Sequence, residues 1–241
     1  MKVFTYCASR NHNSKTREVV NMFLAKMRKY IEIDGIFYTP NNLELLPCRG
    51  CTSCFQGKGC RLDCKDNFSN IKKEMLSADV VIFATPVYAC TISGDLKIFI
   101  DRISYLIHLL ALRGKIGIPI VTASTNSLIE TNDYLDRIMN YLGAKVPFSI
   151  LCTVDFPKQF DSNEFQNVKL EEYAKKAVNL YLGRENYIVK KVQELYYQKM
   201  KKQYKEILGK TAEAIYWEEN GLLSYNSYQD ILDELMINKK F

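Results

Sequence analysis

The amino-acid sequence predicts an α/β fold in which a doubly wound parallel sheet of five strands is covered by helices on both faces. Two observations support this prediction. Short runs rich in aromatic and β-branched residues, typical of buried strands, recur through roughly the first 155 residues. Segments with apolar residues at helical spacing separate these runs. A regular alternation of strand and helix favours parallel strands, because each helix carries the chain across a face of the sheet.

The five strands are expected in the runs 2–8, 31–38, 79–88, 115–124 and 145–154. The third run, "DVVIFATPVY", has the strongest strand pattern. Five strands in this rhythm suit the order 2-1-3-4-5, the flavodoxin-like arrangement. Sheets of this order bind ligands beyond the carboxyl ends of the strands, at the switch point between strands 1 and 3. The loops that follow the strands are therefore where we expect a site.

The intervening helices are expected over residues 14–30, 67–78, 94–112 and 128–143. Apolar side chains line one side of the first helix, among them Val19, Phe23 and Met27. Asn67 could cap the second helix, and Gly143 suits the C-terminal turn of the fourth. The third helix is apolar over most of its surface and is expected to be largely buried.

Near Phe160 the alternation stops and the pattern becomes mostly helical. We expect a domain over residues 1–160, with a cysteine loop at 48–64, and a helical extension over 161–241 that includes a short helix over 227–237. The extension carries aromatic residues that could pack on the domain or on a second copy of the chain. We favour the second arrangement and expect a homo-oligomer.

The composition is that of an ordinary globular protein, with 47% hydrophobic and 25% charged residues among 241. No run approaches the roughly 20 apolar residues that span a bilayer, and the N-terminus lacks a secretory apolar stretch, so a cytoplasmic protein without membrane contact is expected. Much of the net charge of +6 lies between Arg184 and Lys210. The simplest interpretation is a solvated helix face, and the alternative is a docking surface for an acidic protein or a phosphorylated ligand. Nucleic acid is not expected as a partner, because no binding motif accompanies the charge.

The loop after the first strand, "ASRNHNSKT", precedes a helix whose N-terminal N–H groups and dipole favour an anion. Hydroxyl, amide and cationic side chains accompany it: Ser9, Arg10, Asn13, Ser14, Lys15 and Thr16. The loop could hold a monophosphate, or it could be an ordinary polar capping loop. It contains neither GxGxxG nor GxxxxGK[ST], which argues against dinucleotide-binding and P-loop classes.

The loop after the third strand carries the residues Pro86-Val87-Tyr88, and Ser93-Gly94 begin the helix "SGDLKIFIDR". This stretch resembles the NAD(P)H-dependent FMN reductases of flavodoxin-like fold. The resemblance implies that FMN is the cofactor, that the loop after the first strand holds its phosphate, and that Pro86, Val87, Tyr88 and Ser93 lie near its ring. It also implies ring contacts after the fourth strand, at Ser124 and Thr125, and NAD(P)H as a co-substrate. The family usually has Gly-Ser-Pro-Arg in the phosphate loop, where this chain has Ala8-Ser9-Arg10.

A compact group of cysteines, Cys48, Cys51, Cys54 and Cys60, follows the second strand. Four thiolates on a short loop could ligate an iron–sulfur cluster or zinc, or could remain free thiols. Structural zinc usually joins one CxxC to a distant second pair, so zinc is the least favoured of these three alternatives. The spacing resembles the iron–sulfur flavoprotein branch of the same family, which implies a 4Fe–4S cluster. Cys64 is a rival fourth ligand to Cys60.

These features together favour an FMN-dependent oxidoreductase that transfers electrons, with an iron–sulfur cluster on the cysteine loop. Its electron partner would be NAD(P)H, another small molecule, or a protein such as an acidic ferredoxin or flavodoxin. One alternative is a cluster-free NAD(P)H-dependent FMN or quinone reductase. The other is a thiol redox-sensing or interaction protein. No catalytic residue stands out from the sequence.

Overall fold

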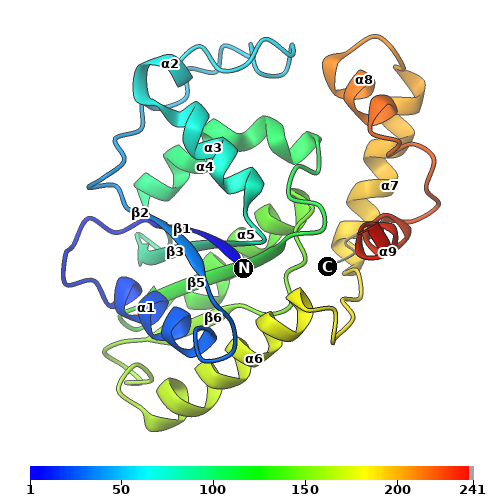
Figure 1. The fold of residues 1–241 in the computed structure, drawn as a ribbon. Coiled ribbons are helices and arrows are strands. Elements are labelled where there is room, and N and C mark those ends of the chain that lie inside the picture. The colour runs from blue at the N-terminus through cyan, green and yellow to red at the C-terminus, as the bar shows by residue number, and fades with distance from the viewer. Residues whose placement is uncertain (239–241) are drawn as a thin grey trace.

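The computed structural model describes residues 1–238, and its centre is a twisted sheet (Figure 1). Five parallel strands lie in the order β2-β1-β3-β5-β6, with the short β4 paired to β3. The strands are β1 (Lys2–Cys7), β2 (Asp34–Tyr38), β3 (Val80–Tyr88), β4 (Thr91–Ile92), β5 (Ile116–Ala123) and β6 (Ile150–Thr153). The predicted order 2-1-3-4-5 is confirmed. The prediction did not include β4, so its fourth and fifth strands are β5 and β6.

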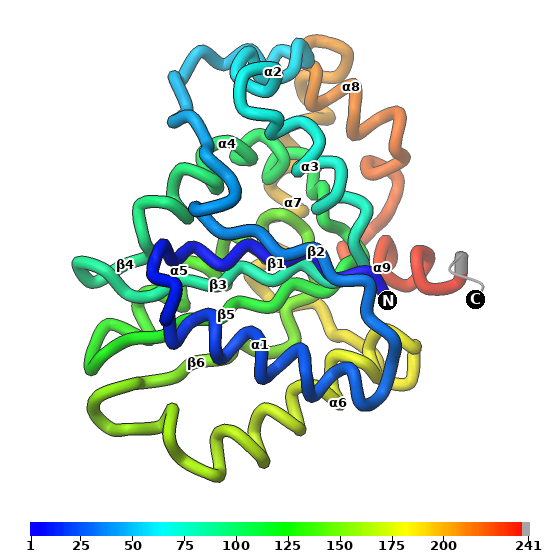
Figure 2. Tube along the Cα trace, turned by 60° about the vertical axis from the view of Figure 1, so that its left-hand side comes forward, coloured from blue at the N-terminus to red at the C-terminus, as the bar shows by residue number. Residues whose placement is uncertain are grey.

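Two hydrophobic cores, one on each face of the sheet, hold its covering helices. On one face, Val80, Ile82 and Ile118 pack with α1 (Lys15–Met27) and α6 (Leu170–Tyr181). On the other face, Phe4 and Phe83 pack with three helices. These are α3 (Phe68–Ser77), α4 (Gly94–His108) and α5 (Leu128–Tyr141). Figure 2 shows the strands running between these two layers. Burial on both faces explains why the strands read as continuous apolar runs rather than as alternating ones.

Several boundaries differ from those expected. The third helix was expected to reach residue 112, but α4 ends at His108, where the chain turns and Leu110 has a φ of 47°. β6 is shorter than its run 145–154, because residues 145–149 contribute only an isolated bridge at Lys145. Asn67 precedes α3 but makes no capping bond from its side chain, because it has a left-handed φ of 56°. The four-residue α2 (Asp63–Asp66) had not been expected.

The strand β4 was also missed, and it changes the loop after β3. Val87 pairs with Ile92 and Tyr88 with Thr91, which leaves Ala89 and Cys90 as a two-residue hairpin turn. Both turn residues have positive φ, 47° and 63°. Hairpins of this kind are normally recognised by Asn-Gly or a similar pair at the turn, where this chain has Ala89-Cys90.

Beyond the sheet, the chain continues through the π-helical turn η1 (Glu164–Lys169) and α6 to α7 (Lys191–Glu206), α8 (Ala212–Glu219) and α9 (Tyr228–Asn238). The last three helices pack against the C-terminal ends of α4 and α5. Trp217 Nε1 donates to His108 O at 2.7 Å, Tyr228 Oη to Gly143 O at 2.6 Å, and Gln193 Nε2 to Ala144 O at 2.7 Å. Buried residues of α6–α9 belong to the same apolar core as β1, β3 and β5. No helix among residues 1–238 is long and apolar enough to cross a membrane.

We expect Gly143→Ala to destabilise the protein by about 2 kcal/mol or more. Gly143 has a φ of 90°, and an added Cβ would lie 2.6 Å from Tyr228 Oη and 3.1 Å from Leu110 O. Gly221→Ala is the matched control, because Gly221 has a φ of 68° and nothing within 4 Å of its Cβ position. Urea unfolding of both variants separates backbone strain from steric conflict. Equal losses would show that the close approach of α9 to Gly143 contributes nothing.

Candidate functional site

The carboxyl ends of β1, β3 and β5 meet around a pocket of about 180 Å³. Eight of the residues predicted from the sequence line it: Ser9, Ser14, Lys15, Thr16, Pro86, Val87, Tyr88 and Ser124. They come from loops more than 30 residues apart in sequence. The pocket lies at the switch point between the first and third strands, where the predicted fold expects a ligand.

One side of the pocket is polar and is built on the N-terminus of α1. Ser14 is the N-cap of this 13-residue helix, and its Oγ accepts from Arg17 N at 3.5 Å. Thr16 Oγ1 lies 2.6 Å from Thr122 Oγ1, which ties α1 to the end of β5. Ser9 and Thr16 are buried, and Lys15 brings a positive charge. Hydroxyls, a cation and a helix N-terminus together favour an anionic group such as a phosphate.

The opposite side is formed by Pro86, Val87 and Tyr88. Tyr88 is 54% exposed, so its ring is available to a flat ligand. Two hydrogen bonds of Ser93 hold this side of the pocket in place. Ser93 N donates to Thr85 Oγ1 at 3.0 Å, and Ser93 Oγ donates to Ala8 O at 2.9 Å.

Four predicted residues do not line the pocket. Ser93 is buried and its hydroxyl holds Ala8, while Asn13 and Thr125 lie exposed nearby. The guanidinium of Arg10, 61% exposed, makes a two-pronged pair with Asp95 at 2.8 and 3.0 Å. The ion pair with Asp95 therefore holds the Arg10 side chain away from the pocket.

Four residues that line the pocket had not been singled out: Asn11, Thr122, Ala123 and Val154. Thr122, Ala123 and Val154 lie at the carboxyl ends of the fourth and fifth expected strands. Only this position at the ends of the expected strands could have identified them from the sequence.

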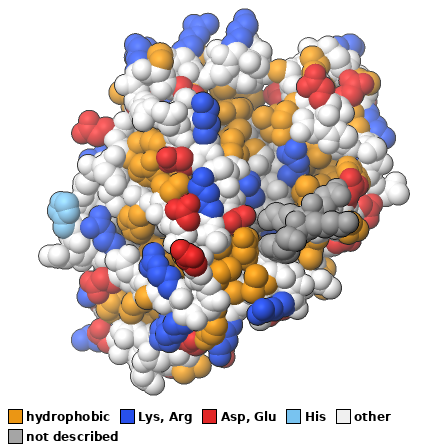
Figure 3. All heavy atoms as spheres, viewed as in Figure 1, with side chains coloured by type: hydrophobic (Ala, Val, Ile, Leu, Met, Phe, Trp, Pro, Cys, Tyr) orange, Lys and Arg blue, Asp and Glu red, His pale blue; other side chains and the backbone are white. Residues whose placement is uncertain are grey.

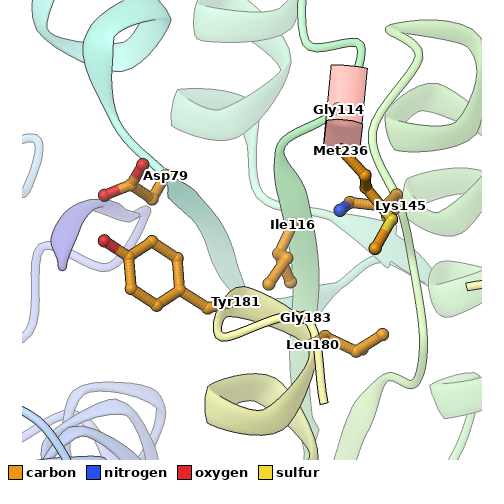
Figure 4. Close-up of a pocket in the computed structure, with 8 residues that line it drawn as sticks. All are labelled: Asp79, Gly114, Ile116, Lys145, Leu180, Tyr181, Gly183 and Met236. Carbon is orange, nitrogen blue, oxygen red and sulfur yellow. The ribbon is translucent and has the colours of Figure 1, made fainter. Parts of the chain in front are cut away.

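A second pocket lies at the opposite, amino edge of the sheet, where Asp79 and Tyr181 face each other (Figure 4). Lys145 and Met236 also contribute to its lining. Its volume is about 40 Å³, enough for little more than one water molecule. It is too small for a nucleotide, so the flavin candidate remains the pocket at the carboxyl edge.

The cysteine loop forms a separate cavity of about 480 Å³. The four predicted ligands, Cys48, Cys51, Cys54 and Cys60, all line it. Cys64 does not: it lies exposed on α2, and its Sγ is 3.7 Å from Arg61 O. Three basic residues, Arg49, Arg61 and Lys65, border the same cavity. Within residues 1–238 the thiols are not gathered closely enough to form a ready metal site.

Left-handed residues allow this loop to curl around the cavity. Gly50, Gly57 and Gly59 have φ of 63°, 75° and 72°, and Thr52 has a φ of 55°. Glycine adopts this conformation without a steric cost, so the three glycines of "CRGCTSCFQGKGC" suit the turns. Cys48 Sγ accepts from Gly50 N at 3.4 Å, which orients the first thiol.

Arg102 of α4 closes the loop by joining its two ends. Arg102 Nη1 donates to Leu46 O at 2.8 Å, just before the first cysteine. The same guanidinium pairs with Asp66, and its Nη2 lies 2.9 Å from Asp63 Oδ1; both residues follow Cys60, the last of the four predicted ligands. Leu46 N in turn donates to Asp66 Oδ2 at 3.0 Å. We call this set of contacts the Arg102 clasp.

The clasp is buried and electrically balanced. The side chains of Arg102 and Asp66 are 0% and 3% exposed, and Lys72 pairs with Asp63 to add a second cation. Burial alone would raise the pKa of Asp66, but hydrogen bonds from Arg102 and Leu46 N hold that pKa below its ordinary value. The buried Arg102–Asp66 pair is therefore stabilised by its mutual contacts, and removing one partner would leave the other buried without a counter-charge.

Comparison with known proteins agrees with the geometry. The family model for NADPH-dependent FMN reductases matches residues 1–158. The chain belongs to this family. The match ends close to the expected domain boundary and leaves α6–α9 outside it.

Curated relatives of this chain are named iron–sulfur flavoproteins. The predicted branch of the family is therefore confirmed. One from Archaeoglobus fulgidus is 30% identical over 112 residues, which cover 44% of this chain and 56% of the relative. Another from that organism is 30% identical over 143 residues, covering 54% and 68%. One from Methanosarcina thermophila is 31% identical over 121 residues, covering 48% and 60%. The chain thus spans little more than half the length of the first of these relatives.

Solved structures share the fold. RosB with a bound flavin-type intermediate superposes with a TM-score of 0.63 at 10% identity, covering 84% of this chain and 87% of RosB. An FMN-dependent NADH-azoreductase of Bacillus anthracis in complex with FMN gives 0.55 at 16% identity, covering 75% and 99%. At these identities the similarity supports the fold alone.

We expect Arg102→Met to destabilise the protein by about 3 kcal/mol, because it leaves Asp63 and Asp66 buried without their main partner. Amide hydrogen exchange should rise most strongly in residues 46–66. Arg113→Met is the control, because Arg113 bonds the neutral side chains of Tyr216 and Asn220 at 2.7 and 2.9 Å. If exchange of the cysteine loop stays at the wild-type rate in Arg102→Met, the clasp does not close the loop.

Proposed function

We propose that this protein is an FMN-dependent oxidoreductase that transfers electrons, with a 4Fe–4S cluster held by Cys48, Cys51, Cys54 and Cys60. The observation that carries the proposal is that these four cysteines, and not Cys64, line one cavity in a chain of the FMN reductase family. When bound, FMN supplies a two-electron centre and the cluster a one-electron centre.

The pocket at the switch point fits a flavin mononucleotide in its chemistry. Ser9, Ser14, Thr16 and the α1 N-terminus would receive the phosphate, and Lys15 would offset its charge. Pro86, Val87 and Tyr88 would lie against the ring system. With about 180 Å³, the pocket is smaller than the roughly 300–1,000 Å³ of enclosing ligand sites, so part of the flavin would remain open to a co-substrate.

The cysteine cavity also fits its proposed group. Thiolates are the ligands that iron–sulfur clusters require, and four thiolates carry a large negative charge. Arg49, Arg61 and Lys65 around the cavity would offset this charge. The loop must still contract onto the cluster, because its thiols stand apart in the structure.

The electron donor would be NAD(P)H or a reduced protein carrier. Exposed lysines of α7 and the following turn, including Lys191, Lys199, Lys202 and Lys205, form a basic surface. Such a surface suits an acidic ferredoxin or flavodoxin by charge complementarity. We place this chemistry in the cytoplasm, where thiols remain reduced.

A cluster-free NAD(P)H-dependent FMN or quinone reductase is the second candidate. The separation of the thiols within the described residues is the observation that favours it. In that case the four cysteines would be a thiol-rich loop, and the flavin would exchange a hydride directly with its co-substrate.

We also propose that the protein forms a homo-oligomer. Phe156 and Ile129, 75% and 57% exposed, are large apolar side chains near the open edge strand β6, which could pair with a second copy. Sedimentation at micromolar concentration tests this, and a monomer would contradict it.

We expect Thr16→Asp to bind FMN roughly thirtyfold more weakly than Thr16→Asn. The two side chains have the same shape, and only Asp adds a negative charge beside the proposed phosphate site, at a cost of about 2 kcal/mol. Equilibrium dialysis of the flavin measures the difference. Equal affinities would show that the FMN phosphate does not bind at the α1 N-terminus.

We expect anaerobic protein to contain about four irons and four sulfides per chain. Alanine at any one of Cys48, Cys51, Cys54 or Cys60 should lower both contents while FMN stays bound. Cys64→Ala should retain them, because Cys64 lies outside the cavity. Iron, acid-labile sulfide and flavin are assayed together. Flavin without iron or sulfide, even after reconstitution, would select the cluster-free reductase.

A further inference from the structure

A third cavity, of about 310 Å³, lies between the cysteine loop and the C-terminal extension. Figures 1 and 2 both place α8 beside the end of the loop, far along the chain from it. The loop contributes Phe55, Gly57 and Gly59, α4 and its end contribute Tyr105 and Leu109, and α8 contributes Ala212, Glu213 and Tyr216. Cys54 lines both this cavity and the cysteine cavity. Hydrophobic side chains gather in the hollow between these two parts of the surface (Figure 3).

The walls of this cavity are held in place by specific contacts. The ring of Phe55 meets His108 edge-on, with centroids 5.1 Å apart. Trp217, one turn along α8 from Glu213, donates to His108 O at 2.7 Å. Arg113 Nη1 donates to Tyr216 Oη at 2.7 Å. These contacts fix the walls from α4 and α8 relative to each other and hold Phe55 of the loop against them.

The chemistry of the lining is selective. Phe55, Tyr105 and Tyr216 offer aromatic surfaces, which favour a flat ring system. Gly59 has no atom within 4 Å of its Cβ position, so a ring can approach its backbone closely. Among these apolar groups stands one carboxylate, Glu213, only 15% exposed.

The charge of Glu213 is poorly offset by its neighbour His108. Glu213 Oε1 lies 3.8 Å from His108 Nδ1, beyond hydrogen-bond distance. Burial lowers the pKa of His108 more than Glu213 raises it, so the imidazole is mostly neutral at pH 7. A partly buried carboxylate in this setting gains from a ligand that donates a hydrogen bond.

We propose that this cavity binds an aromatic molecule of one or two fused rings that carries a hydroxyl, of the quinone and hydroquinone class. The rings lie between Phe55, Tyr105 and Tyr216, and the hydroxyl of the reduced form donates to Glu213. Because Cys54 forms part of the wall, the ligand contacts a residue of the proposed redox centre.

The site rests on the proposed function for its role as an electron acceptor. The overall reaction is quinone + NAD(P)H + H⁺ → hydroquinone + NAD(P)⁺. The nicotinamide loses a hydride, which supplies two electrons and one proton, and the solvent supplies the second proton. The quinone gains two electrons and two protons at its oxygens.

Binding is tested first without any redox chemistry, on the whole chain, with α-naphthol and naphthalene as probes in equilibrium dialysis. Both are flat two-ring molecules, and only α-naphthol can donate to Glu213. We expect wild-type protein to bind α-naphthol saturably. Glu213→Leu should lower its preference for α-naphthol over naphthalene roughly tenfold, the effect of losing a hydrogen bond to a charged group. Glu218→Leu, on the exposed side of α8, should leave the preference unchanged.

A second variant fills the cavity. Ala212→Leu puts a larger side chain at the first residue of α8 and should weaken both probes at least roughly tenfold. Near-ultraviolet circular dichroism of the buried Trp217 reports whether α8 remains folded. With menadione as the acceptor, Ala212→Leu should slow quinone turnover while reduction of bound FMN by the donor keeps its rate.

Absence of saturable binding, or binding that neither Ala212→Leu nor Glu213→Leu alters, would overturn the proposal. Weakened probe binding in Ala212→Leu together with unchanged menadione turnover would overturn the acceptor role. The two hypotheses fail separately. Protein that binds α-naphthol but never incorporates iron rejects the cluster and keeps the site, whereas loaded protein that does not bind the probes rejects only the site.

Discussion

The Arg102 clasp is the interaction on which the proposed chemistry of this protein depends. The cysteine loop has few buried side chains, and three of its five cysteines, Cys48, Cys51 and Cys64, are exposed. Arg102 fixes the distance between the two ends of the loop, because one guanidinium bonds Leu46 on one side and Asp63 and Asp66 on the other. The loop between them can then change shape within a closed boundary. This arrangement suits a group of thiols that must contract onto a cofactor without losing their place on the fold.

Arg102 can serve in this way because α4 is rigid. The same buried side of the helix packs Phe99 and Ile103 into the core against the sheet. Phe99 contacts the rings of Tyr6, Phe68 and Phe83 at 4.4 to 5.5 Å, so the helix is held by both β1 and β3. The burial of Arg102 is therefore a consequence of helical periodicity: one side of the helix is apolar, and the charged residue lies where that side meets the loop. A lysine could not replace it, since only the planar fork of arginine reaches both carboxylates and a carbonyl.

The sequence predicted the sheet order and most of the proposed flavin pocket, because both follow from local patterns. Buried strands read as apolar runs, and the residues after them must meet at one edge of the sheet. The positions of the Arg10 and Ser93 side chains could not be predicted in this way. Arg10 pairs with Asp95 and Ser93 donates to Ala8 O, and both partners are distant in sequence. The hairpin at Ala89 and Cys90 was missed because its residues are not those that favour positive φ. The role of Arg102 as a link between the loop ends was also out of reach, since nothing near it in the sequence identifies Leu46 or Asp66 as its neighbours.

The sites described here follow one another along α4. Ser93, at its start, secures the wall of the flavin pocket, Arg102 and Ser104 face the cysteine loop, and Tyr105 and Leu109 line the aromatic cavity. The helix has 15 residues and is about 22 Å long. Along this helix the order is therefore the proposed flavin pocket, the cysteine loop and the aromatic cavity. The wall of the last cavity comes from α8, outside the residues that match the family. The portion of the chain that matches the family thus supplies the proposed flavin pocket and the cysteine loop, and the extension adds the α8 wall beside the cysteines.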